Sequence, residues 1–132
     1  MAQRAALARC LARQPSVLLM DEPFGALDEV TRGEMQALLR KVVADFHTAV
    51  VLITHDIDEA LLLADRIVLL GGAPGRILGT WPVDLPQPRA DLLSEMGALR
   101  LEILTRLRAA LRDVRGLGPI NAESAKETMD VP

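Results

Sequence analysis

Three short apolar runs in the first half of the chain predict β-strands. They are "VLLM" (residues 17–20), "AVVLIT" (49–54) and "RIVLL" (66–70). The first two show no polar alternation, which is typical of strands that are buried on both faces in a parallel sheet. The segment "RILGTW" (76–81) follows the turn-forming "GGAPG" and is predicted to return beside the third run as a hairpin partner.

Apolar residues at intervals of three and four predict an amphipathic helix over residues 29–46. Another helix is predicted over residues 2–13, where Ala, Leu and Arg favour helix formation and Pro15 ends the run. The apolar positions of the longer helix are Met35, Leu38, Leu39, Val42, Val43 and Phe46.

Two further helices are predicted after the second strand. Asp56 can cap a helix over residues 57–64, with Glu59 three positions later completing a capping box. A last helix is predicted over residues 90–114, after the proline-rich "PVDLPQPR". Its apolar stripe consists of Met96, Leu99, Ile103, Leu107 and Leu111.

Strands and helices therefore alternate as far as residue 70, which indicates an α/β fold with parallel strands and crossover helices. The 132 residues suffice for one domain. No internal repeat is visible. Residues 119–132 lack periodicity and are expected to form a disordered tail.

Composition argues against nucleic acid as a partner. The net charge is −3, from 15 basic and 18 acidic residues, and the only aromatic residues are two Phe and one Trp. Nucleic-acid-binding proteins usually show a basic excess and often an aromatic stacking surface. The single cysteine, Cys10, excludes an internal disulfide, suits a reducing compartment and is expected to be buried. No stretch reaches the ~18 apolar residues of a membrane span.

Titratable residues follow the first two predicted strands directly. Asp21 and Glu22 come after "VLLM", and His55 and Asp56 come after "AVVLIT". Ligands of open α/β sheets bind beyond the carboxyl ends of the strands, so these side chains are expected to meet at one edge if the strands are neighbours. An Asp at a strand end can hold Mg²⁺ of a bound nucleotide, usually through water. An adjacent Glu can take a proton from the attacking water.

These residues also have structural interpretations. Asp28 precedes the helix over 29–46 and can act as its N-cap, a role that does not exclude a contact with a partner. Asp21 and Glu22, taken alone, could form a solvated strand end. The combination of both carboxylates with His55 in the order of a nucleotide site favours the functional interpretation.

The motifs together resemble the C-terminal half of an ATP-binding cassette (ABC) transporter ATPase. "LLMDEPFGALD" and "ITHDIDEALLLADRIVLL" carry the resemblance, which covers roughly residues 1 to 115. It implies that Asp21 is the Walker B aspartate on Mg²⁺ and Glu22 the catalytic base. It also implies that Asp28 belongs to the D-loop at a dimer interface and that His55 is the switch histidine on the γ-phosphate. "MAQRAALARCLARQP" resembles the end of the signature motif and the helix after it.

The resemblance also implies domains, ligands and partners. Residues 1–85 correspond to the C-terminal half of the ATPase domain, 86–115 to a helical extension and 116–132 to the tail. "DEPFGALDEVTR", "PGRI" and "DLPQPR" resemble importers of nitrate, sulfonate, taurine and related solutes. ATP and Mg²⁺ are the implied cofactors of the intact protein. The implied partners are a second ATPase subunit, permease subunits and, indirectly, a periplasmic solute-binding protein, with the subunit on the cytoplasmic face of the inner membrane.

The sequence contains no phosphate loop of the form G-x-x-x-x-G-K-[ST]. The chain alone is therefore expected neither to bind Mg-ATP tightly nor to hydrolyse it, and to expose an apolar sheet edge that promotes association. A non-enzymatic remnant or interaction module that pairs with complete ABC subunits is the alternative. A DNA-repair or chromosome-structure ATPase is a third interpretation, but the coiled-coil heptads that it predicts are not visible.

Overall fold

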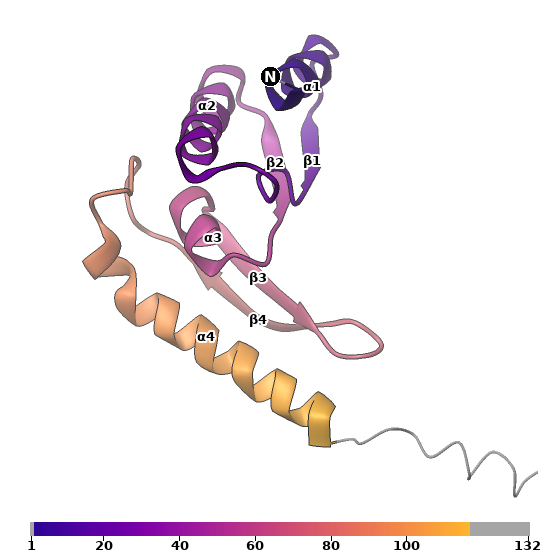
Figure 1. The fold of residues 1–132 in the computed structure, drawn as a ribbon, viewed down its shortest axis with the longest axis vertical. Coiled ribbons are helices and arrows are strands. Elements are labelled where there is room, and N and C mark those ends of the chain that lie inside the picture. Colours follow the sequence, from indigo (N-terminus) through magenta and orange to yellow (C-terminus); the bar gives the residue numbers. More distant parts are fainter. Residues whose placement is uncertain (1, 117–132) are drawn as a thin grey trace, which may run out of the picture.

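The structure is a computed structural model that describes residues 2–116 (Figure 1). Helices and strands alternate through β3, and a hairpin and a long helix follow. The elements are α1 (Ala2–Ala12), β1 (Val17–Asp21), α2 (Glu29–Phe46), β2 (Ala49–Ile53), α3 (Ile57–Leu63), β3 (Arg66–Gly71), β4 (Arg76–Pro82) and α4 (Leu93–Gly116). Each element lies within a few residues of its prediction from the sequence.

Strands β1 and β2 pair in parallel, with Val17 opposite Ala49 and Asp21 opposite Ile53. Helix α2 makes the crossover between them (Figure 1). Asp28 caps the start of α2, and His47 ends it in the left-handed conformation at φ 51°. The predicted parallel pair with its crossover helix is confirmed.

The first hydrophobic core lies between this sheet and helices α1 and α2. Both helices pack on the same face, against Leu18 and the partly buried Met20, Val50 and Leu52. Phe24, which is 1% exposed, lies in the same cluster. The buried members are Leu7, Leu18, Phe24, Met35, Leu39 and Val42.

The prediction that these strands are buried on both faces is wrong for the described residues. The outward side chains alternate with the buried ones and are exposed, and Leu19 reaches 76%. Helices α1 and α2 both cover the opposite face, and no other element within residues 2–116 covers this one. The remaining outward apolar residues, each more than half exposed, are Val17, Val51 and Ile53.

We expect this exposed apolar face to drive self-association of the isolated chain. Contiguous apolar surface of this kind is uncommon on monomeric proteins. Leu19→Lys should shift the sedimentation-velocity distribution toward monomer. Val30→Lys is the matched control, because Val30 is an equally exposed apolar residue on α2 at 72%. A wild-type chain that sediments as a monomer at high concentration would contradict the expectation.

Strand β3 corrects the predicted topology. It does not extend the parallel sheet but pairs antiparallel with β4 in a separate two-stranded sheet. The turn between them uses Gly72 at φ 86°, a conformation that glycine adopts at little cost. The local hairpin gives β3 its one strand partner, and residues 2–116 form a mixed α/β arrangement with one parallel pair and one antiparallel pair of strands.

A second hydrophobic core joins this hairpin to α3 and α4. Leu61, Trp81, Met96 and Ile103 are its buried members. The Trp81 indole donates a hydrogen bond to Glu102 of α4 (2.9 Å), so the ring's polar edge is satisfied where it is buried. Figure 1 shows α4 running along the hairpin.

Helix α4 begins three residues later than predicted, after the Pro88 segment. Only the first part of its apolar stripe is buried, since Leu111 is half exposed.

Cys10 is exposed, contrary to expectation. The predicted disordered tail, residues 119–132, lies outside the described residues, while Gly116, assigned to the tail by the predicted domain division, ends α4. Among residues 2–116, no helix is both long and apolar enough to span a bilayer.

Candidate functional site

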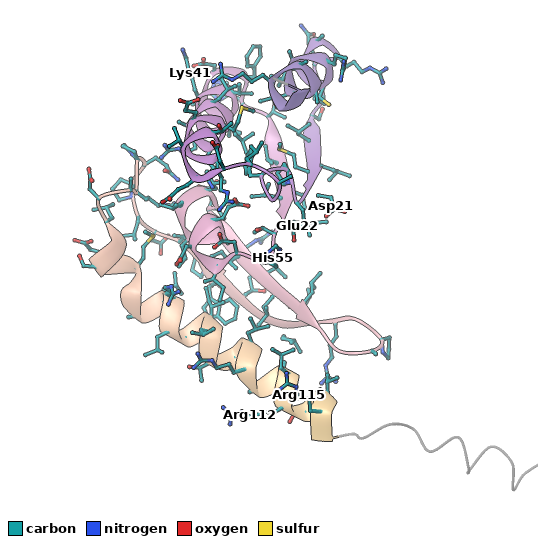
Figure 2. The ribbon with its side chains drawn as sticks, viewed as in Figure 1. Asp21, Glu22, Lys41, His55, Arg112 and Arg115 are labelled. Atoms are coloured by element: carbon teal, nitrogen blue, oxygen red, sulfur yellow. The ribbon has the colours of Figure 1, made fainter. Side chains whose placement is uncertain are left out.

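The carboxyl ends of β1 and β2 bring Glu22 and His55 into direct contact. The Glu22 amide donates to the Ile53 carbonyl (2.8 Å), which extends the parallel ladder by one residue beyond Asp21. The Glu22 side chain then reaches His55, with Glu22 Oε1 2.7 Å from His55 Nδ1. Figure 2 shows Asp21, Glu22 and His55 at one end of the sheet, with Lys41 toward the opposite end. The predicted convergence of the two strand ends is thus observed for this pair.

The backbone at Glu22 is held in an uncommon conformation. Its φ is 47°, in the left-handed region that a non-glycine residue occupies at a cost of about 1–3 kcal/mol. The turn that follows is closed by hydrogen bonds from the Gly25 amide to the Glu22 carbonyl (3.4 Å) and from the Leu27 amide to the Phe24 carbonyl (3.2 Å). The buried Phe24 ring anchors this turn in the first core. Packing therefore holds Glu22 in a geometry that its own backbone preference disfavours.

His55 projects from the junction between β2 and α3. Its side chain is 84% exposed. Asp56 caps α3 by accepting hydrogen bonds from the amides of Asp58 (2.9 Å) and Glu59 (3.2 Å). Since Asp56 follows His55 directly, the cap fixes the backbone from which the imidazole extends.

Half of the predicted capping box is absent. The Glu59 side chain does not return to the Asp56 amide, which instead donates to the Thr54 hydroxyl (3.0 Å). Glu59 is buried and accepts a hydrogen bond from Gln36 of α2 (3.0 Å). The Glu59 carboxylate thus accepts from the Gln36 side chain instead of from the Asp56 amide, and this contact connects α3 with α2.

Contact with Glu22 raises the pKa of His55 above its ordinary value of 6.5. The hydrogen bond that His55 donates to Glu22 is the main cause, the negative charge of Glu22 adds to the shift, and Asp56 and Glu59 contribute smaller effects. Because the folded pKa lies above the unfolded one, the contact stabilises the fold fully below about pH 6.5. This stabilisation is lost as the pH rises through the raised folded value.

We therefore expect the His55 ring resonances to titrate above the midpoint of an unstructured histidine. In Glu22→Gln the midpoint should fall toward 6.5, because the main cause of the shift is removed. The measurement is an NMR pH titration of the His55 ring in the chain and in the variant under the same conditions. An unchanged His55 midpoint in the variant would show that the contact does not exist in solution.

Asp21 lies on the exposed face of the sheet, one residue before Glu22. No hydrogen bond or ion pair within residues 2–116 engages its carboxylate, so both oxygens can accept a ligand. Carboxylate oxygens suit the hard Mg²⁺ ion. Within residues 2–116, no group of three or more potential metal ligands lies together.

Asp28 does not join the Glu22–His55 pair. Its carboxylate accepts a hydrogen bond from the Thr31 amide (2.9 Å) at the start of α2, which confirms the predicted N-cap. The hydrogen bonding to Thr31 lowers the pKa of Asp28. The D-loop role implied by the resemblance remains a prediction.

The site is exposed at the edge of the sheet, since the His55 side chain is 84% exposed and that of Glu22 39%. One surface hollow is lined in part by Gln14 and Phe46 and another by Arg40 and Gln87, and neither includes Asp21, Glu22 or His55. A ligand at this edge would need further protein surface to enclose it.

Two residues that sequence reasoning did not single out are Gln87 and Arg89. Both hydrogen-bond to the end of α3. Their only signal in the sequence was the proline-rich "DLPQPR", which indicates a break in regular structure but not what the side chains bind.

Comparison with known proteins identifies the family. The chain is 50% identical over 110 residues to the aliphatic sulfonates import ATP-binding protein SsuB 1 of Pseudomonas aeruginosa, covering 83% of this chain and 44% of that protein. It is 52% identical over 103 residues to SsuB of Granulibacter bethesdensis, covering 78% of this chain and 42% of that protein.

A relative with another named solute also matches. The bicarbonate transport ATP-binding protein CmpC of Synechococcus elongatus is 53% identical over 90 residues, which cover 67% of this chain and 14% of that protein. No protein-family model matches. The chain spans less than half the length of these curated relatives. This similarity shows that the chain belongs to the family of ABC transporter ATP-binding subunits.

Proposed function

We propose that this chain forms the Mg²⁺- and water-handling side of the ATP site in an ABC importer subunit. The observation that carries the proposal is the 2.7 Å contact between Glu22 and His55 at adjoining strand ends, with Asp21 beside it. The homology to ATP-binding subunits of sulfonate and bicarbonate importers supports it. The surface that cradles the phosphates would come from residues outside this sequence.

Each residue has a distinct chemical task in this proposal. Glu22 accepts a proton from the water that attacks the γ-phosphate, a step worth about 10²–10⁴ in rate. In the protonated imidazolium, His55 donates from Nδ1 to Glu22, and Nε2 can donate a second hydrogen bond to a γ-phosphate oxygen. Asp21 would hold Mg²⁺ through water. When bound with ATP, the ion would neutralise negative charge on the phosphate oxygens.

The transported solute is proposed from the relatives, which are named for aliphatic sulfonates and bicarbonate, and from the motif resemblance, which adds nitrate and taurine. Sulfonate, nitrate, taurine and bicarbonate are small solutes that carry a negative charge or an acidic group, and the chain would energise import of a member of this class. The proposed partners are a second ATP-binding subunit, contacted near Asp28, and the permease, to which a periplasmic solute-binding protein delivers the solute. The proposed location is the inner face of the cell membrane.

A second candidate function is a non-catalytic module that pairs with complete subunits. The exposed apolar face around Leu19 favours it, because such a face can bind another protein. The two candidates differ in whether the Glu22–His55 pair supports turnover when a phosphate-binding surface is supplied.

A chimera tests the proposal. The matching segment of the Pseudomonas relative is replaced by this chain, and ATP hydrolysis is measured by phosphate release. We expect Mg²⁺-dependent turnover that falls about 10²–10³-fold in His55→Ala. Removal of one hydrogen-bond donor to the negative charge of a transition state usually has an effect of this size. The matched control is His47→Asn, since His47 ends α2 in a left-handed conformation that Asn tolerates. Full turnover in His55→Ala would refute the assignment, and a folded chimera without turnover would favour the binding module.

A further inference from the structure

The segment over residues 83–89 folds back across the end of α3. The Val83 amide donates to the Asp65 carbonyl (2.9 Å), just beyond the helix. Arg89 Nη1 donates to the carbonyls of Leu61 (2.9 Å) and Ala64 (2.6 Å). Gln87 Nε2 donates to the Leu62 carbonyl (2.9 Å). Side chains of this one segment thus satisfy three carbonyls at the end of α3 that the helix itself leaves free.

Arg89 is fully enclosed, with 2% of its surface exposed, and no carboxylate binds it within the described residues. Its remaining hydrogen bonds go to the carbonyls of Leu85 (2.9 Å, from Nε) and Val83 (3.2 Å, from Nη2). A buried guanidinium is costly unless its N–H groups are satisfied, and carbonyl dipoles at a helix C-terminus are a favourable environment for a cation. Burial lowers the pKa of Arg89, and the charge of Asp65 opposes that shift. The planar Arg89 guanidinium therefore holds segment 83–89 against the end of α3 in one arrangement.

Gln87 also contacts α2, which belongs to the first hydrophobic core. Its Oε1 accepts a hydrogen bond from Arg40 of α2 (3.0 Å), while its Nε2 holds α3. The two hydrophobic cores are separate clusters. Two side-chain hydrogen bonds connect α2 with the second part of the fold. Gln36 of α2 binds Glu59 of α3, and Arg40 of α2 binds Gln87 of segment 83–89. The orientation of α3 relative to the first sheet thus depends on these two hydrogen bonds and on Leu63, the α3 residue that packs against the first core.

This orientation determines where His55 lies. The imidazole is 84% exposed, and Glu22 is its one hydrogen-bonding partner in the described part of the chain. No tight packing confines the ring, so its position follows the backbone between β2 and α3. Helix α3 has only seven residues, and a displacement of its end moves its start as well.

We infer that Arg89 and Gln87 are positioning residues that anchor α3 and thereby hold the His55 imidazole against Glu22. The inference rests on the proposed function, in which His55 meets the γ-phosphate. The position of the His55 imidazole relative to Glu22 is a property of the 132-residue chain, and it can be tested without ATP.

The test is the NMR titration of His55 in the chain carrying Gln87→Ala or Arg89→Lys. Gln87 is exposed, so its truncation leaves both cores intact, and Arg89→Lys keeps the charge but removes the planar fork. Each variant should lose at least half of the upward displacement of the His55 midpoint. Arg100→Lys is the matched control, because Arg100 binds Asp58 on the exposed side of α3 (2.7 Å) without holding the helix end.

A purely structural role would lower the melting temperature but leave the His55 midpoint at its wild-type position. That result in Gln87→Ala overturns the inference, even if Arg89→Lys fails to fold. In the chimera, the same variants should lower kcat by up to about 10²-fold with little change in KM, as expected for a misplaced group. A displaced midpoint in a chimera that never hydrolyses ATP would support the positioning role while contradicting the proposed function.

Discussion

The Glu22→Gln chimera should bind ATP but hydrolyse it about 10²–10⁴-fold more slowly than its parent, because the amide cannot accept the proton of the attacking water. Glutamine preserves the size of the side chain but removes the negative charge whose contact raises the pKa of His55. Binding is measured by calorimetry with Mg-ATP, and turnover by phosphate release. Loss of turnover with retained binding separates a chemical role of Glu22 from a role in holding the nucleotide.

Glu34→Gln is the control for this prediction. Glu34 is an exposed glutamate on α2 whose carboxylate lies 3.4 Å from Arg4, a surface pair that contributes little to stability. Its neutralisation should leave turnover unchanged. Near-normal hydrolysis in Glu22→Gln would remove Glu22 as the general base.

The second large effect concerns stability. Phe24→Ala should lower the free energy of unfolding of the chain by about 3–5 kcal/mol, the usual cost of emptying an aromatic core position. Phe24 is 1% exposed and anchors the turn after Glu22. Domains have only about 5–15 kcal/mol in total, so the variant should be largely unfolded at modest urea concentrations. The measurement is urea denaturation followed by circular dichroism.

Phe46→Ala provides the comparison, since Phe46 is the other phenylalanine and is 60% exposed at the end of α2. Its truncation should change the unfolding midpoint little. Equal effects of the two substitutions would mean that the first core is not arranged as described. The titration of His55 in a folded fraction of Phe24→Ala would also report whether the turn directs Glu22.

Local patterns were sufficient to predict the part of the fold that forms the site. The apolar runs that became β1 and β2, and the three-four spacing of α2 between them, define a crossover unit whose strand ends must lie together. The convergence of Glu22 and His55 follows from that topology. The cap at Asp28 was equally local, since it needs only a short polar side chain before a helix.

Features that depend on distant partners were not predictable. Burial of both strand faces was the wrong expectation because α1 and α2 share one side of the sheet, which no local pattern encodes. Glu59 binds Gln36 rather than the nearby amide because tertiary contacts override a local motif. Arg89 was overlooked because its four acceptors are backbone carbonyls, which carry no signature in the sequence.

The most direct test of the central claim is a structure of the Glu22→Gln chimera with Mg-ATP bound. Our account predicts Mg²⁺ at the phosphates with Asp21 reaching it through water, His55 within hydrogen-bonding distance of a γ-phosphate oxygen, and a water between position 22 and the γ-phosphorus. A nucleotide bound with its phosphates away from Asp21 and His55 would contradict the account.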